Sequence, residues 1–178
     1  MIYLTGYHST TKEAAKDILR NNEFILSTGD KEWLGNGIYF YKEYKDALEW
    51  NRDEHKSQAD AILHGIICVN DDEYIDFDTE NGKKQIRKIK ENLIKDFKDT
   101  VKSISVQELQ CLIANLTWDE YPQVKVLSAS FHPDRSLLKT LIDERPFRKE
   151  FCVRDNKYIS GINEINVVPI SKEWFRYG

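Results

Sequence analysis

Three short segments, far apart in the sequence, each place one chemically capable side chain beside a stretch typical of a β-strand. They are residues 6–10, 34–40 and 150–155, and they supply His8, Tyr39 and Glu150. An imidazole exchanges hydrogen bonds with hydroxyl groups, a phenol ring stacks on an aromatic ligand, and a carboxylate stabilises positive charge developing on a sugar. If the segments meet in the fold, they form a site able to hold a dinucleotide and stabilise a sugar cation.

His8 stands near the end of the first predicted strand, and the chain then turns through Ser9 and Thr10 into a predicted helix. Thr10 and Glu13 have the spacing of a capping box. A turn into a helix leaves backbone amides free to meet a polar group of a ligand. The alternative is a histidine that bonds one neighbour and has no further role.

Tyr39 follows Gly35 and Gly37, two glycines that indicate a tight turn or a close backbone approach before a strand. A second large aromatic residue, Trp50, lies eleven positions further along, in a predicted helix. Two such rings suit a flat, positively charged ligand, because the faces of Tyr and Trp attract cations. The alternative is that both rings belong to the hydrophobic core.

Glu150 opens an otherwise apolar strand, so its carboxylate is expected at the rim of a sheet, beside buried neighbours. In a partly dry cleft such a carboxylate is a strong stabiliser of a developing cation. The alternative is a surface ion pair with Arg148 or Lys149, worth less than about 1 kcal/mol.

The composition indicates a folded, acidic protein. The chain has 178 residues, 40% of them hydrophobic, which predicts a single domain over 1–178 with a substantial core. Its net charge of −4 argues against a mainly electrostatic nucleic-acid binder. Without a signal-peptide pattern or a long apolar run, and with three cysteines, we expect a cytoplasmic protein with reduced thiols and no membrane partner. Glycine-rich nucleotide motifs and metal-ligand spacings do not occur, so we expect no metal.

Short strands interleaved with helices predict an α+β fold. Strands are expected at 2–8, 24–26, 37–41, 61–69, 74–77, 124–131, 150–154 and 165–170. Helices are expected at 11–21, 45–53, 82–100, 106–116 and 136–142. The segment from about 79 to 120 is therefore largely helical.

Basic residues gather in two places. Between 83 and 98 they alternate with acidic residues, which predicts a solvated helix face, with a contact surface for RNA, DNA or an acidic partner as the alternative. Arg145, Arg148 and Lys149 precede Glu150 in a predicted loop, where their positive charge suits phosphate contacts.

In type, order and local context, the segments around His8, Tyr39 and Glu150 resemble the ADP-ribosyltransferases of the His-Tyr-Glu class, which includes diphtheria toxin and the poly(ADP-ribose) polymerases. The likeness covers residues 1–50 and 124–170. It implies a split mixed or antiparallel β-sheet with flanking helices, in which the segment of about 79–120 is a helical insert. It also implies transfer of ADP-ribose from NAD to a macromolecular acceptor.

The resemblance implies a role for each candidate residue, with NAD as the substrate. Nicotinamide lies between Tyr39 and Trp50, His8 holds its ribose and the backbone at Ser9 holds its carboxamide. Glu150 stabilises the sugar cation, so His8, Tyr39 and Glu150 are the expected catalytic residues. Ala47 stands where polymerase-like relatives have a serine, so one hydrogen bond is missing. The residues expected to bind NAD are His8, Ser9, Thr10, Gly37, Tyr39, Ala47 and Trp50.

The resemblance leaves the acceptor open among protein, RNA and DNA, with Arg145, Arg148 and Lys149 expected to contact it. Arginine-modifying transferases usually carry Glu or Gln two residues before the catalytic Glu, and Arg148 at that place disfavours an arginine acceptor. By family analogy the protein is an intracellular toxin or phage-defence effector with an antitoxin as partner. Two alternatives remain: an NAD glycohydrolase, and a catalytically silent module that binds ADP-ribose or a partner.

Overall fold

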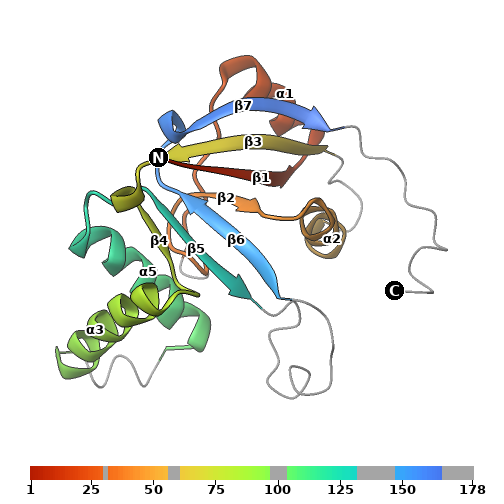
Figure 1. Ribbon diagram of the computed structural model, residues 1–178. Coiled ribbons are helices and arrows are strands. Elements are labelled where there is room, and N and C mark those ends of the chain that lie inside the picture. Colours follow the sequence, from red (N-terminus) through yellow and green to blue (C-terminus); the bar gives the residue numbers. More distant parts are fainter. Residues whose placement is uncertain (30–31, 56–60, 97–103, 132–146, 166–178) are drawn as a thin grey trace.

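The computed structural model describes residues 1–29, 32–55, 61–96, 104–131 and 147–165. Within these residues the chain forms one seven-stranded mixed sheet with helices on both faces (Figure 1). The strand order is β4-β5-β6-β2-β1-β3-β7; β4 and β5 run parallel, and the other neighbours run antiparallel. The α+β class predicted from the sequence is confirmed.

The strands follow the apolar runs of the sequence. They are β1 (Ile2–Thr10), β2 (Ile38–Tyr41), β3 (Ala61–Val69), β4 (Tyr74–Asp76), β5 (Val126–Phe131), β6 (Arg148–Val153) and β7 (Ile159–Ile165). The helices are α1 (Lys12–Asn21), α2 (Tyr44–His55), α3 (Glu80–Asp96) and α5 (Val106–Glu120). Two short 3₁₀ turns, η1 (Asp71–Glu73) and η2 (Asn156–Tyr158), precede β4 and β7.

The expected strand at 24–26 is wrong. The backbone of Phe24 bonds instead to the side-chain amide of Asn156, which accepts from its N–H at 2.7 Å and donates to its carbonyl at 2.9 Å. Because one side chain satisfies both backbone groups, this segment needs no strand partner. Phe24 itself is buried in the core.

Two predicted boundaries near the C-terminal half also differ. The last described strand, Ile159–Ile165, begins where no strand was expected; of the strand expected at 165–170 only Ile165 is described, and residues 166–170 lie outside the described residues. The predicted helix at 136–142 lies outside them as well. β6 begins at Arg148, two residues before the expected start.

The two faces of the sheet carry separate cores. On one face α1 lies against β3 and β7, and the core there includes Phe24 and Phe40. On the other face α5 covers β5 and β6 through a cluster that contains Trp118 and Leu34. α2 packs near Tyr41 on β2. Figure 1 shows α5 and α2 at different ends of the sheet.

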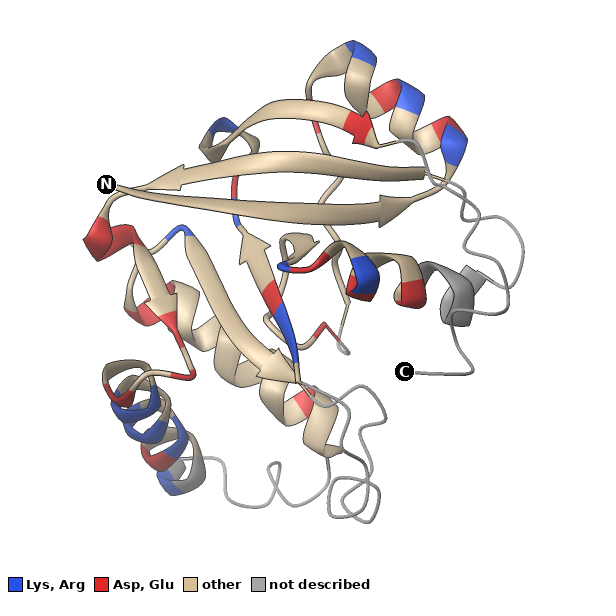
Figure 2. Cartoon of the chain, turned by 45° about the vertical axis from the view of Figure 1, so that its right-hand side comes forward, with Lys and Arg blue, Asp and Glu red and all other residues tan. Residues whose placement is uncertain are grey.

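The pair formed by α3 and α5 occupies the segment expected to be largely helical. The two helices pack through a small apolar cluster. Figure 2 shows Lys and Arg together with acidic residues along α3. Lys83 pairs with Glu80, and Lys88 pairs with Glu120 of α5. These exposed pairs support the interpretation of a solvated helix face and are individually worth little.

Three further properties concern the described part of the chain. No helix in it is long and apolar enough to cross a membrane. Cys68, Cys111 and Cys152 form no disulfide with one another. No three or more His, Cys, Asp or Glu side chains of these residues are grouped so as to hold a metal ion.

The start of α1 lies one residue later than the predicted capping box. Thr11, not Thr10, is the N-cap, and its hydroxyl accepts a hydrogen bond from the amide of Ala14 at 3.2 Å. Thr10 is the last residue of β1 and pairs with Ala61. The strand therefore continues to the residue before the cap.

We expect Thr11→Val to lower the free energy of unfolding by about 1 kcal/mol, because it removes the capping hydroxyl while keeping a β-branched side chain. Thr10→Val is the matched control, and it should change this free energy by less than about 0.5 kcal/mol, because β-branched residues suit a strand. Urea unfolding followed by circular dichroism measures both variants. Equal losses would contradict the assignment of Thr11 as the cap.

Candidate functional site

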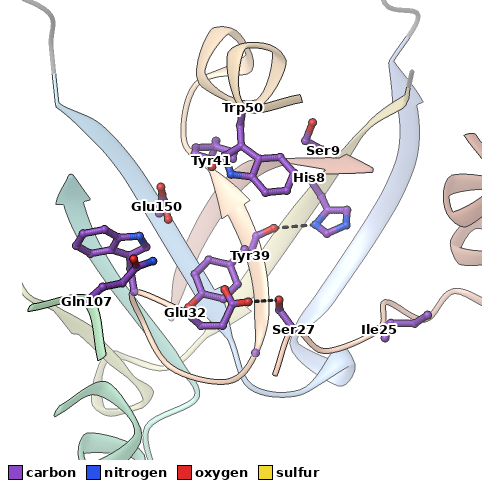
Figure 3. Close-up of a pocket in the computed structure, with 12 residues that line it drawn as sticks. His8, Ser9, Ile25, Ser27, Glu32, Tyr39, Tyr41, Trp50, Gln107 and Glu150 are labelled. Atoms are coloured by element: carbon purple, nitrogen blue, oxygen red, sulfur yellow. Dashed lines mark hydrogen bonds between the residues drawn. The ribbon is translucent and has the colours of Figure 1, made fainter. Parts of the chain in front are cut away.

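A pocket of about 360 Å³ lies against the sheet between residues contributed by α2 and α5 (Figure 3). This volume falls at the lower end of the range of roughly 300–1,000 Å³ that is typical of small-molecule sites. All four residues on which the sequence analysis centred, His8, Tyr39, Trp50 and Glu150, line it. The full set is His8, Ser9, Ile25, Ser27, Glu32, Trp33, Gly37, Tyr39, Tyr41, Trp50, Gln107 and Glu150.

The pocket lies where two neighbouring strands part. β1 and β2 pair directly at one position, Tyr7 opposite Tyr41. Beyond this pair, the side chain of His8 bonds to β2 in place of backbone, with Nδ1 at 2.8 Å from the carbonyl oxygen of Tyr39. A carbonyl can only accept, so we assign the proton to Nδ1 as the donor. Nε2 of the neutral ring is then an acceptor.

The imidazole of His8 is neutral at pH 7. Burial lowers its pKa below the ordinary value of 6.5, although the hydrogen bond to Tyr39 acts in the opposite direction. Its ring packs edge-on against Phe24, with centroids 4.9 Å apart, and at a tilt on Phe40, 5.7 Å away. The ring is therefore held on three sides, and its remaining nitrogen suits a hydroxyl donor.

Tyr39 contributes its ring to the pocket and its hydroxyl to the loop that precedes β2. The hydroxyl donates to the carbonyl of Gly35 at 2.7 Å and accepts from the amide of Leu34 at 2.9 Å. Burial strongly raises the pKa of this phenol. The hydroxyl is thus a structural clamp and not an acid or base at neutral pH.

Helix α5 fixes the same loop from outside. The side-chain carbonyl of Asn115 accepts from the amide of Asn36 at 2.9 Å. Gly35 adopts a positive φ of 76°, and a Cβ there would lie 2.5 Å from the side-chain oxygen of Asn115. A side chain at Gly37 would overlap the thiol of Cys152. The two glycines noted in the sequence are therefore required by one left-handed turn and one close approach.

Glu150 lies on β6 between two strands, opposite Tyr41 of β2 and Ala129 of β5. Paired residues of neighbouring strands share a face, and alternation places Tyr39 on the same face as Tyr41. Glu150 is only 7% exposed. Figure 3 shows it on the side of the pocket opposite His8, with Tyr39 and Trp50 between them.

Helix α2 supplies Trp50 but not Ala47. Trp50 is half-buried, packs against the cluster that contains Tyr41 and Leu48, and lines the pocket. Ala47 is completely buried in the same cluster and does not line the pocket, so its expected contact with NAD is not supported. Its short side chain lies beneath the larger neighbours that pack on this side of α2.

The turn after His8 matches the expectation only in part. Ser9 lines the pocket, as predicted, while its hydroxyl is buried and has no hydrogen-bond partner among the described residues. Thr10 does not line the pocket, because it completes β1 opposite Ala61.

The basic residues before Glu150 do not form the expected acceptor-binding cluster. The guanidinium of Arg148 lies 3.7 Å from a carboxylate oxygen of Asp46 and 2.5 Å from one of Glu49, both on α2. The side chain of Arg148 is only 12% exposed. The ammonium nitrogen of Lys149 lies 2.5 Å from a carboxylate oxygen of Asp76 and 2.5 Å from one of Asp78. Arg148 and Lys149 are successive residues of β6, so their side chains point to opposite faces of the sheet. Arg145 lies outside the described residues.

The two ion-pair groups shift the pKa values of their members in different directions. Burial raises the pKa of Asp46, although Arg148 opposes this shift. Burial favours a lower pKa for Lys149, but its bonds to Asp76 and Asp78 prevail and raise it. Lys149 is therefore firmly cationic and engaged by carboxylates.

Sequence reasoning missed half of the pocket. Tyr41 could have been found from the sequence, because it lies two residues after Tyr39 and therefore on the same face of the strand. The loop before β2 contributes Glu32 and Trp33, in the kind of segment that often carries binding residues. Gln107 comes from the first turn of α5, and nothing in the sequence links it to the other segments. The missed residues are Ile25, Ser27, Glu32, Trp33, Tyr41 and Gln107.

Comparisons with known proteins give one partial relative. The chain is 43% identical over 73 residues to the uncharacterized protein MJ0359 of Methanocaldococcus jannaschii. The match covers 38% of this chain and spans about a third of the relative, 34% of its length. No family model matches the chain, and no solved structure does.

We expect an NMR titration of the His8 ring protons to give a pKa below 6.5. With the pKa depressed in the folded state, protons bind more strongly to the unfolded chain, so stability falls as the pH drops below 6.5 toward the folded pKa. His8→Asn, whose amide can still donate to Tyr39, should lose this part of the pH dependence. A measured pKa at or above the ordinary value would contradict this prediction.

We expect Tyr39→Phe to lower the free energy of unfolding by about 1–3 kcal/mol, because the amide of Leu34 loses its acceptor while the ring stays in place. Tyr3→Phe is the matched control, since Tyr3 is 67% exposed and should change stability by less than about 0.5 kcal/mol. Thermal and urea unfolding measure both variants. A Tyr39→Phe protein as stable as wild type would show that the clamp contributes nothing.

Proposed function

We propose that the protein is an NAD-dependent ADP-ribosyltransferase, which moves ADP-ribose from NAD to a macromolecular acceptor. The observation that supports this proposal is the convergence of His8, Tyr39, Trp50 and Glu150, from the four elements β1, β2, α2 and β6, around one pocket. Their order and local context resemble the His-Tyr-Glu class, and the parted strands β1 and β2 are consistent with a split sheet.

The aromatic residues suit the nicotinamide end of NAD. The nicotinamide ring of NAD is flat and positively charged, and the rings of Tyr39 and Trp50 both line the pocket. Aromatic faces attract cations, and burial strengthens this attraction. A pocket of about 360 Å³ accommodates the nicotinamide and its ribose, with the rest of the dinucleotide extending outward.

His8 and Glu150 suit the ribose. The neutral imidazole presents Nε2 as an acceptor for a ribose hydroxyl, because Nδ1 is committed to Tyr39. Glu150 lines the opposite side of the pocket and is 7% exposed, so its charge acts through little water. A carboxylate fixed there stabilises positive charge on the sugar without having to reorganise.

The reaction then proceeds by departure of nicotinamide. The bond between its ring nitrogen and C1′ of the ribose breaks, and the electron pair leaves with the neutral ring. Positive charge moves to the sugar, where Glu150 stabilises it, and a nucleophile of the acceptor bonds to C1′. A cytoplasmic toxin or phage-defence role, with an antitoxin as partner, rests on the resemblance alone.

The test is Glu150→Gln, which keeps the shape of the side chain and removes its charge. We expect nicotinamide release and label transfer from NAD to fall by about 10²–10³-fold, the typical cost of losing a preorganised electrostatic stabiliser. Glu164→Gln, on the exposed edge strand β7, is the matched control and should leave both unchanged. Both variants are assayed with labelled NAD and a cell lysate, after circular dichroism has confirmed folding.

The same assay separates the alternatives. Label transfer by Glu150→Gln equal to that of wild type would contradict the assignment of Glu150. Nicotinamide release without any labelled macromolecule would identify a glycohydrolase. Calorimetric NAD binding without turnover would identify a silent binding module, and a wild-type protein that neither binds nor cleaves NAD would overturn the proposal.

A further inference from the structure

Glu32 is a second carboxylate in the pocket, and the proposed function gives it no role. It lines the same cavity as Glu150 but comes from the loop before β2. The hydroxyl of Ser27 donates to its Oε1 at 2.7 Å (Figure 3). One carboxylate is enough to stabilise the sugar cation, so Glu32 needs a separate explanation.

Hydrogen bonds hold the described residues on either side of Glu32. Ser27 and Gly37 exchange two backbone hydrogen bonds, of 2.8 and 3.0 Å. The carbonyl of Glu32 itself accepts from the amide of Gly35 at 2.9 Å. Tyr39 clamps the following residues, as described above. The backbone around Glu32 is therefore fixed by several bonds and its carboxylate by the one from Ser27, an arrangement that suits a group that must position a reactant.

The described residues that line the pocket give it a negative potential. They include two carboxylates, Glu32 and Glu150, and no lysine or arginine. His8 adds no charge, because burial keeps its pKa below 6.5. Arg148, the basic residue on the same face of β6 as Glu150, is held by carboxylates of α2 and does not line the pocket.

The surroundings of Glu32 also favour a cation. Its neighbour Trp33 lines the pocket, and an indole face attracts ammonium and guanidinium groups. A phosphate-rich acceptor would meet two negative charges in the same pocket and would be repelled. Complementary charge therefore favours a basic protein side chain over a nucleic acid as the acceptor.

We infer, on the basis of the proposed function, that the acceptor is a cationic nitrogen of a protein side chain, the ammonium of a lysine or the guanidinium of an arginine. Glu32 binds this group and accepts one proton from it. The freed electron pair of the nitrogen bonds to C1′ as the bond from C1′ to nicotinamide breaks. Nicotinamide leaves as a neutral molecule, and the modified nitrogen keeps one positive charge.

This inference changes the expectation that Arg148 disfavours an arginine acceptor. That expectation rested on the Glu or Gln that arginine-modifying transferases usually carry two residues before the catalytic Glu. In the structure the guanidinium of Arg148 is occupied by Asp46 and Glu49. The second carboxylate of the pocket comes instead from a loop more than a hundred residues earlier in the chain.

The experiment uses the full chain and NAD labelled in its adenylate half. Polylysine, polyarginine, a neutral peptide rich in serine, and single-stranded RNA and DNA oligonucleotides are the acceptors. For each we measure transferred label and released nicotinamide. We expect label on one or both basic polymers, with at least tenfold less on the neutral peptide and the oligonucleotides.

Three variants test Glu32 itself. In Glu32→Gln we expect the ratio of label transferred to a basic polymer to nicotinamide released without acceptor to fall by about 100-fold, the usual scale for a lost general base. Ser27→Ala keeps the carboxylate but removes its hydrogen bond, so this ratio should fall by a smaller factor. Glu164→Gln is the matched control and should keep the wild-type ratio. Nicotinamide release reports in each case that the pocket is folded.

Each outcome decides between the inference and the proposed function. Label on the oligonucleotides and not on the basic polymers, or an unchanged ratio in Glu32→Gln, would overturn the inference and leave the transferase intact. A loss of nicotinamide release without acceptor as large as the loss of transfer in Glu32→Gln would also overturn it, because Glu32 would then serve NAD cleavage or folding. Wild-type protein that releases no nicotinamide with any acceptor would overturn both.

Discussion

The site depends on one hydrogen bond between a side chain and a backbone carbonyl. β1 and β2 pair directly only at Tyr7 and Tyr41, and His8 bonds the carbonyl of Tyr39 beyond that point. An unsatisfied carbonyl in this partly buried place would cost about 1–3 kcal/mol, so the imidazole makes the separation of the strands tolerable. The same bond fixes the tautomer of His8 and leaves its other nitrogen for a ligand. This one hydrogen bond therefore satisfies the carbonyl where the two strands separate and orients the histidine toward a ligand.

The opposite wall of the pocket depends on helix α5. Asn115 bonds the backbone of Asn36, and the thiol of Cys111 donates to the carbonyl of Gly29 at 3.2 Å. Gln107, at the start of the helix, lines the pocket. The segment expected as an insert is therefore part of the site, since it holds the loop that carries Glu32 and Trp33. Removing it would expose the sheet residues that pack against Trp118 of α5, such as Leu127 and Cys152, and leave this loop without its anchor.

Residues whose position follows from local periodicity were predictable. Short apolar and aromatic runs located β1, β2, β3 and β6, and with them His8, Tyr39 and Glu150. The cap of α1 was missed by one residue, because Thr10 and Thr11 are both suitable caps and strand pairing with β3 decides between them. Arg148 and Lys149 were misplaced for a related reason, since a strand that starts two residues early sends them to opposite faces.

Residues placed by contacts between distant segments were not predictable. Ala47 and Trp50 share one side of α2, and only the packing around them makes one a core residue and the other a pocket wall. Glu32 has no periodic context, and its place depends on bonds that involve Ser27, Gly35 and Tyr39. Gln107 required knowledge of how α5 docks on the sheet. The sequence pattern therefore located the strands, and tertiary packing selected which side chains meet.

The placement of the tryptophans gives the protein a built-in optical reporter. Of its four indoles, Trp33 and Trp50 line the pocket, whereas Trp118 of α5 is 2% exposed in the core between this helix and the sheet. Fluorescence emission from the first two responds to whatever enters the cavity, because an aromatic or charged guest changes the polarity around them and can quench them by contact. The core indole supplies a steady background. A ligand can thus be detected by spectroscopy of the unmodified chain, before any turnover is measured.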